Sequence, residues 1–99
     1  MSRVISHQSK VRSSPEQISV DLAGEVVILS TKSGVYYGLD EVGARIWHLL
    51  KEPKTIQDLL VTIVQEFDIT ADHCEPDLFD LLDDLRSKGL VEIYDETTL

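Results

Sequence analysis

The sequence predicts a small α+β domain, because short alternating segments are followed by longer segments with a helical period. Residues 17–39 contain three stretches of alternating or β-branched apolar side chains, separated by two turns. Residues 40–89 instead repeat apolar side chains at three- and four-residue intervals. The chain has 99 residues, 42% of them hydrophobic, which is enough to fill one core. We therefore expect a three-stranded antiparallel sheet followed by three helices.

The three stretches before residue 40 are expected to be strands. Residues 17–22 alternate apolar and polar side chains, which is the pattern of a half-buried strand. Residues 26–30 are rich in β-branched side chains, and residues 35–39 complete the group. Short turns containing glycine join the strands, so they should form a meander whose first and third members are edges. The third strand has no Lys or Pro that would block its edge.

The first two helices are indicated by capping residues and by apolar stripes. Asp40 is a candidate N-cap for the first helix, and Pro53 stops that helix. Thr55 is the candidate N-cap of the second helix. The stripes comprise Val42, Ile46, Leu49 and Leu50 in the first helix, and Ile56, Leu59, Leu60, Ile63, Val64 and Phe67 in the second.

The third helix is expected to begin near Glu75, because Pro76 suits the first turn of a helix and disrupts its interior. Gly89 provides its C-terminal cap, and residues 90–94 alternate like a short closing strand. Three helices followed by an extended segment match the plan of a winged helix-turn-helix domain. This architecture alone does not identify what is bound.

The expected organisation is a loose N-terminal arm at residues 1–16, one domain at residues 17–94 and a short tail at residues 95–99. The chain has no apolar run near the roughly 20 residues of a membrane helix, and its N-terminus lacks a secretory apolar stretch. Its single cysteine, Cys74, allows no intramolecular disulfide. We therefore expect a cytoplasmic protein without a membrane partner.

The net charge of −9 lies in the last third of the sequence. Residues 1–65 contain seven acidic and seven basic residues, whereas residues 66–99 contain eleven acidic residues and two basic ones. Residues 71–85, the region of a recognition helix, have no Lys or Arg. A DNA-binding helix would need basic side chains to neutralise phosphates, so a winged-helix transcription factor is the weaker alternative. The acidic region could attract basic partners or simply be a solvated face.

Sites of catalysis or cofactor binding are not evident in the sequence. The three histidines are far apart, and the adjacent pair His73-Cys74 is not a metal site. No acidic run follows a calcium-loop pattern, and no glycine-rich phosphate loop occurs. A chain of this length has little volume for a pocket together with its supporting residues. We therefore expect a protein that is not an enzyme and needs no cofactor.

The run YYGLDEVGARIWHLL at residues 36–50 resembles the central signature of PqqD-like proteins. These proteins are also called recognition elements of ribosomally synthesised and post-translationally modified peptides. The resemblance includes EVVILSTKSGVYYGLD before this run, TIQDLLVTIVQEFDI after it, and LLDDLRSKGLVEI near the end. It spans about residues 17–94. Among family members, the chain looks most like the free-standing leader-binding protein of lasso peptide biosynthesis.

The resemblance implies that a leader peptide adds as an antiparallel strand to the third strand, in a groove shared with the third helix. The implied peptide-binding residues are Val35, Tyr36, Tyr37, Gly38, Leu39, Asp77, Leu78, Leu81, Asp84 and Leu85. One of the two tyrosines should pack inward and the other should lie near the groove, but the sequence does not decide which. Gly38 is equally compatible with close backbone approach and with a bend. Most of the leucines are also expected core residues.

The expected function is that of a non-catalytic adaptor that presents the leader to processing enzymes. By resemblance, its partners are a precursor leader peptide, a transglutaminase-like leader peptidase and a macrolactam-forming cyclase. The alternative within the family is a PqqD-type chaperone for a radical-SAM maturase. Trp47 is expected to pack in the core behind the third strand, whereas Arg45 could serve either the helix surface or a partner enzyme.

Overall fold

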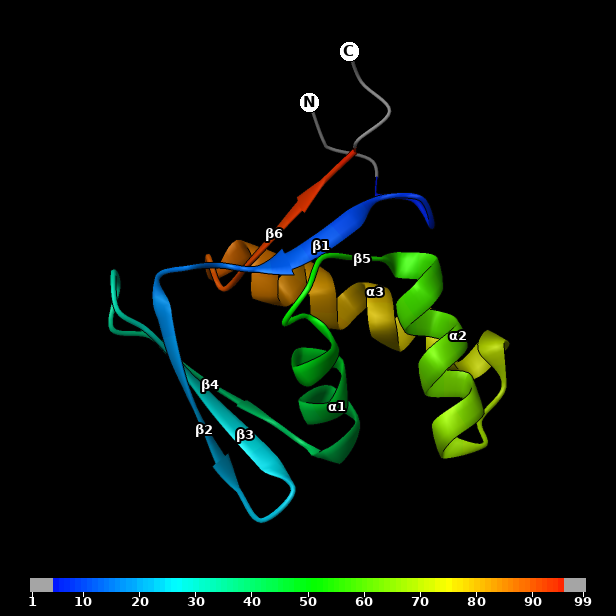
Figure 1. Ribbon diagram of the computed structural model, residues 1–99, viewed down its shortest axis with the longest axis horizontal. Helices are drawn as coiled ribbons and strands as arrows, with labels where there is room; N and C mark the ends of the chain where they lie inside the picture. Colours follow the sequence, from blue (N-terminus) through cyan, green and yellow to red (C-terminus); the bar gives the residue numbers. More distant parts are fainter. Residues whose placement is uncertain (1–4, 96–99) are drawn as a thin grey trace.

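The computed structural model describes residues 5–95 and contains two small antiparallel sheets and three helices (Figure 1). In chain order, the elements are β1 Lys10–Ser13, β2 Gln17–Leu22, β3 Glu25–Ser30, β4 Tyr36–Leu39, α1 Glu41–Leu49, β5 Lys54–Thr55, α2 Ile56–Phe67, α3 Ala71–Ser87 and β6 Val91–Tyr94. The predicted three-stranded antiparallel sheet and the three helices are confirmed.

The predicted meander is the sheet β2–β3–β4, with β3 in the centre and β2 and β4 as edges. In its register, Ile18 pairs with Leu29, and Ile28 pairs with Tyr37. One face packs on the helices through the buried side chains of Val26, Ile28 and Leu39. The edge position predicted for the third strand is therefore present in the structure.

The orientation of β2 differs from its expected half-buried pattern. Its apolar residues Ile18, Val20 and Leu22 point away from the helices and are 55%, 51% and 52% exposed. Its polar residues occupy the helix-facing side, where Asp21 Oδ1 lies 2.9 Å from His48 Nε2 on α1. Alternation identified the strand correctly but did not identify which face is covered, because side chains of period two alternate in either orientation.

The predicted caps of the first two helices are confirmed. The Asp40 side chain accepts a hydrogen bond of 2.9 Å from the Gly43 amide, so α1 begins directly after β4. The Thr55 hydroxyl accepts a bond of 3.0 Å from the Asp58 amide at the start of α2. These bonds satisfy amides that a helix start otherwise leaves without a partner.

Helix α3 begins at Ala71, so the predicted start near Glu75 is wrong. The Thr70 hydroxyl caps the helix by accepting from the His73 amide at 3.3 Å, and Pro76 lies within the helix. Proline lacks an amide hydrogen, so the Asp72 carbonyl four residues earlier loses its helical donor. The N-cap and the burial of Cys74 hold the first turn in place.

Gly89 ends α3 as predicted, in a left-handed conformation with φ of 74°. Its amide donates to the Arg86 carbonyl at 3.0 Å, and the Leu90 amide donates to the Leu85 carbonyl at 2.9 Å. This pair of bonds is the Schellman arrangement, for which glycine is the preferred residue. The chain then reverses into β6.

A second sheet, with the order β5–β1–β6, was not predicted. Strand β1 lies within the segment expected to be a loose arm, and for residues 10–13 that description is wrong. Val11 is fully buried, and β1 pairs along its whole length with β6. Strand β1 has only four residues, which are too few to show a period-two pattern. Its partner β6 lies at the other end of the described chain, so no local sequence signal indicates the pairing.

The winged helix-turn-helix arrangement is not confirmed. A wing would be a hairpin after α3, but within residues 5–95 the single strand β6 follows that helix. Strand β6 pairs with β1, which comes before the β2–β3–β4 sheet in the chain. The shared core lies between the two sheets and the three helices and includes Trp47, Leu50, Ile63, Leu82 and Leu85. No helix among residues 5–95 is both long and apolar enough to span a membrane.

Candidate functional site

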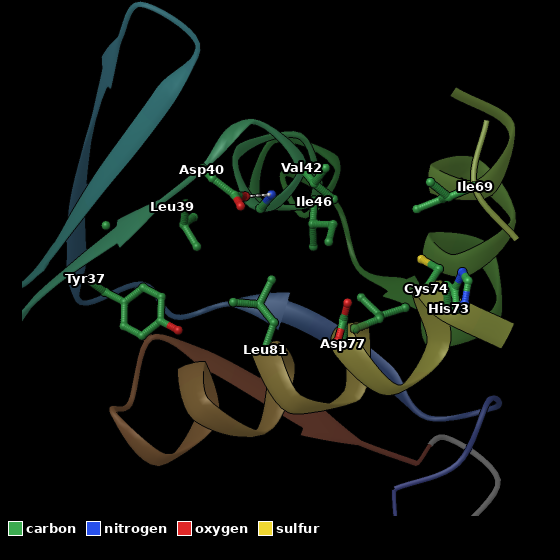
Figure 2. Close-up of a pocket in the computed structure, with 13 residues that line it drawn as sticks. Tyr37, Leu39, Asp40, Val42, Ile46, Ile69, His73, Cys74, Asp77 and Leu81 are labelled. Atoms are coloured by element: carbon green, nitrogen blue, oxygen red, sulfur yellow. Dashed lines mark hydrogen bonds between the residues drawn. The ribbon is translucent and has the colours of Figure 1, made fainter. Parts of the chain in front are cut away.

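An open cavity of about 580 Å³ lies between the β4–α1 corner and α3 (Figure 2). Its lining residues are Tyr37, Gly38, Leu39, Asp40, Val42, Gly43, Ile46, Ile69, His73, Cys74, Asp77, Leu78 and Leu81. We call this cavity the groove. Figure 2 shows β4 and α1 on one side and α3 on the other, with Leu39 and Leu81 both pointing into the space between them.

The wall on the β4–α1 side is apolar and closely packed. Leu39 ends β4 with its side chain inward, and Val42 and Ile46 follow one helical turn apart on α1. A Cβ atom at Gly43 would lie 3.1 Å from Leu39 Cδ2 and 3.3 Å from Leu39 Cβ. Glycine at this position therefore permits the tight β4–α1 corner that forms the wall.

The opposite wall is a stripe along α3. Leu78 is almost fully buried, whereas Leu81 is only partly buried and reaches toward the groove. Asp77 lies one turn before Leu81 and also lines the groove. The middle of the groove is therefore mostly apolar, with the Asp77 carboxylate on its α3 rim.

One end of the groove contains Ile69, His73 and Cys74, near the start of α3. Burial, together with the charge of Asp77, raises the pKa of the Cys74 thiol above its usual value. The thiol is therefore a protonated, largely apolar part of the wall rather than a reactive thiolate. Ile69 is exposed and borders this end.

The other end is closed by a polar bridge between β4 and α3. The Tyr37 hydroxyl donates a hydrogen bond of 2.8 Å to Asp84 Oδ2, and Lys88 Nζ donates to Asp84 Oδ1 at 3.1 Å. The Lys88 ammonium also lies 5.4 Å from the centroid of the Tyr37 ring. Tyr37 is therefore the tyrosine that faces the groove, a choice that alternation alone could not make.

The bridge changes the acidity of both partners. Burial, followed by the hydrogen bond to Asp84 and the charge of Asp84, raises the pKa of Tyr37 to about 12. The hydrogen bonds from Tyr37 and Lys88 lower the pKa of Asp84. At neutral pH the bridge thus consists of a neutral phenol, a carboxylate and an ammonium group.

The free edge of β4 borders the groove. The Ser30 amide donates to the Val35 carbonyl at 2.9 Å, and β3–β4 pairing continues from there in antiparallel register. Main-chain bonding directions alternate in such a ladder. The N–H and C=O groups of Tyr37 and Leu39 therefore point toward β3, whereas those of Tyr36 and Gly38 point outward. No strand of the described chain lies beside that outer edge.

Six of the ten sequence-predicted site residues line the groove: Tyr37, Gly38, Leu39, Asp77, Leu78 and Leu81. Asp84 closes its end through Tyr37. The remaining three do not line it. Tyr36 is on the outward face of β4 and is 71% exposed, Val35 precedes β4 and is exposed, and Leu85 is a buried core residue.

The structure adds lining residues that sequence reasoning missed: Asp40, Val42, Gly43, Ile46, Ile69, His73 and Cys74. Val42 and Ile46 could have been found, because they are four positions apart and follow the predicted edge strand directly. The residues at the start of α3 could not, because that turn was expected to lie outside the helix.

Two residues with expected or undecided roles lie outside the groove. Trp47 is 6% exposed and packs in the core, as predicted. Arg45 forms a two-bond contact with Glu66 on α2, with N–O distances of 2.7 and 2.9 Å. Within residues 5–95, no cluster of three or more His, Cys, Asp or Glu side chains could hold a metal ion.

Comparisons with known proteins give a family match and a structural match. The model of the family described as coenzyme PQQ synthesis protein D (PqqD) matches residues 25–91. A solved structure, "TbiB1 in Complex with the TbiA(beta) Leader Peptide", shares 38% sequence identity with the chain at a TM-score of 0.76. The match covers 82% of this chain and 94% of that one. No curated protein matches the chain.

Proposed function

Because the chain belongs to the PqqD family, we propose that it binds the leader segment of a ribosomally made precursor peptide. Its similarity to TbiB1, which was solved with a leader peptide, supports this function. The structural observation that carries the proposal is the open β4 edge beside an apolar groove. An extended peptide placed there gains main-chain bonds and side-chain contacts together.

The leader would bind by strand addition to β4. The outward N–H and C=O groups of Tyr36 and Gly38 can bond to an antiparallel peptide strand. A Cβ atom at Gly38 would meet nothing within 4 Å, so packing within the described chain does not require glycine there. Its missing side chain leaves room for an incoming backbone.

The groove would hold alternate side chains of the added strand. Leu39, Ile46 and Leu81 offer an apolar pocket, and Asp77 can attract a basic group. Two to four strand bonds contribute about 0.5–1.5 kcal/mol each, and one buried aromatic anchor contributes about 1.5–3 kcal/mol. After the cost of ordering the peptide, a Kd from about micromolar to tens of nanomolar is expected.

The role that follows is that of a non-catalytic, cytoplasmic adaptor. Its partner would be a transglutaminase-like leader peptidase of a lasso peptide pathway, with a macrolactam-forming cyclase as a further partner. The family description favours one second candidate, a PqqD-type chaperone that serves a radical-SAM maturase. Genes next to that of this chain distinguish the two, because each pathway encodes a different enzyme. A DNA-binding role is weaker, because α3 has no Lys or Arg before Arg86.

The test is a titration of this protein into a labelled synthetic leader, taken from the precursor encoded beside it. Fluorescence anisotropy should give the Kd range stated above. A scrambled peptide of the same composition is the control, because it keeps charge and hydrophobicity but loses the spacing of anchors. Its affinity should be at least about tenfold weaker. Equal binding of both peptides would contradict leader recognition.

A further inference from the structure

The outer face of the β2–β3–β4 sheet is apolar and uncovered. We define this outer face by the residues Ile18, Val20, Leu22, Val27, Leu29 and Tyr36. Ile18 pairs with Leu29, which pairs with Tyr36, so these side chains form one continuous row across the three strands. In Figure 1 all three helices lie on the other side of this sheet. No described element packs against the outer face.

This exposure is unusual for an antiparallel sheet with one face in water, where the solvent side is normally polar. Ile18, Val20, Leu22 and Tyr36 are each more than half exposed. Glu25, at the turn end of β3, is the one charged residue that shares their side of the sheet. A contiguous apolar surface with one carboxylate at its turn end, on a chain of net charge −9, is a candidate surface for contact with another protein.

The outer face continues toward the proposed leader strand. Tyr36 and Gly38 belong to β4, so a strand added there would project alternate side chains onto the same face, beside Tyr36. Gly38 has no side chain of its own to separate the leader from Val27. A protein that covers the outer face would therefore contact the receptor and the leader together.

We propose that the outer face is the docking surface for the enzyme that processes the precursor, and that a bound leader strand completes it. This inference rests on the proposed function. The enzyme's matching surface would be apolar and without an acidic cluster, because it must approach an acidic protein. The groove and the docking surface then lie on opposite sides of β4, so both can be occupied at once.

The area of the outer face argues against a second copy of this chain as the occupant. Six-residue strands extend about 20 Å, and three strands span about 14 Å, which gives roughly 300 Å². Two copies packed face to face would bury on the order of 600–900 Å², below the roughly 1,200–2,000 Å² of a stable interface. A bound leader would add a fourth strand and enlarge the outer face. The enzyme would then bind this protein only when a leader is bound.

The test uses the variant Ile18→Thr/Val20→Thr/Leu22→Thr, which places a β-branched, strand-compatible side chain at all three positions but removes apolar surface. Val61→Thr is the matched control, because Val61 is an exposed apolar residue on α2. Both proteins are assayed with the full precursor and the peptidase encoded beside this chain. The triple variant should bind the labelled leader as the parent does, yet support cleavage at least about tenfold more slowly. The control should match the parent in both assays.

Cleavage at the parental rate by the triple variant would overturn the docking surface while leaving leader binding intact. Sedimentation velocity of the parent and the triple variant then tests whether a second copy of this chain covers the outer face. A parent dimer that becomes a monomer in the triple variant, with cleavage unchanged, would assign the face to a second copy. If the parent itself fails to bind the leader, the proposed function fails, and that result is separate from a loss of cleavage alone.

Discussion

The Tyr37 hydroxyl and the Asp84 carboxylate join the free edge of β4 to α3 across a hydrogen bond of 2.8 Å. This contact fixes the spacing of the two groove walls at the end nearest the C-terminus of α3. It also predicts a measurable titration, because the pKa of Tyr37 is raised to about 12. The phenol of the folded protein should ionise above the usual pH of about 10.

Removing the bridge should therefore change the alkaline titration. Ultraviolet absorbance of the parent should show a phenolate transition near pH 12, which should be absent in Tyr37→Phe. Asp84→Asn should move it downward, since the carboxylate charge and its acceptor strength are lost. Because the folded-state pKa is the higher one, unfolding of the parent should become easier as pH rises between about 10 and 12. This effect should be smaller in Asp84→Asn, where burial of Tyr37 remains, and the contribution of Tyr37 should be absent in Tyr37→Phe. Identical curves for all three proteins would contradict the bridge.

Proline substitutions on β4 should separate leader binding from folding. Tyr36→Pro and Gly38→Pro should stay folded, because their N–H groups point outward, but each should lose about tenfold or more in leader affinity, or about 1.4 kcal/mol. Tyr37→Pro should disrupt the fold, because its N–H faces β3. Circular dichroism monitors folding, and anisotropy monitors binding. Parental affinity in both outward variants would exclude strand addition.

Two leucines on α3 should behave differently when shortened. Leu81→Ala should weaken leader binding with a small loss of stability, because Leu81 is partly buried and lines the groove. Leu85→Ala should cost about 2–5 kcal/mol of unfolding free energy, because Leu85 is 1% exposed in the core. Its remaining folded fraction should bind the leader normally. Urea denaturation and anisotropy on the same samples check both statements, and the reverse pattern would refute the assignment of the α3 wall.

The acidic rim should affect the rate of association with a basic leader. Asp77→Asn should slow binding and reduce its dependence on salt, because Asp77 lines the groove. Asp80→Asn is the matched control, since it removes the same charge from a position that does not line the groove. Stopped-flow measurements of the association rate constant at low and high ionic strength compare the two variants. Equal effects from the two variants would mean that general charge, rather than the rim, attracts the peptide.

Sequence reasoning predicted the strands and helices more reliably than it predicted which surfaces they share. Capping residues such as Asp40 and Thr55 act locally, so the starts of α1 and α2 followed from the sequence. The start of α3 did not, because the cap at Thr70 outweighs the cost of Pro76. The apolar side of β2 was expected to be buried, yet it faces outward, because alternation does not specify which side other elements cover.

The candidate site was predicted where it depends on one strand and one helix stripe. The groove lies between the edge strand β4 and helix α3, and both elements were predicted. Its predicted lining residues therefore include Tyr37 and Leu39 from the strand and Leu81 from the helix. Ile69 lies in the α2–α3 connection and His73 in the first turn of α3, and both line the groove through a tertiary approach that leaves no periodic signal in the sequence. Leu85 was misplaced by one turn, since core and groove leucines share the same stripe.

The pairing of β1 with β6 has a consequence for the order of events during synthesis. Lys10 lies opposite Tyr94, so this ladder cannot close until nearly the whole described chain has left the ribosome. The hairpins of β2, β3 and β4 involve close neighbours in the chain and can form early, whereas distant pairings form late. A nascent chain would therefore form the β4 edge before the β1–β6 ladder can close, so the site for strand addition would precede the completed fold.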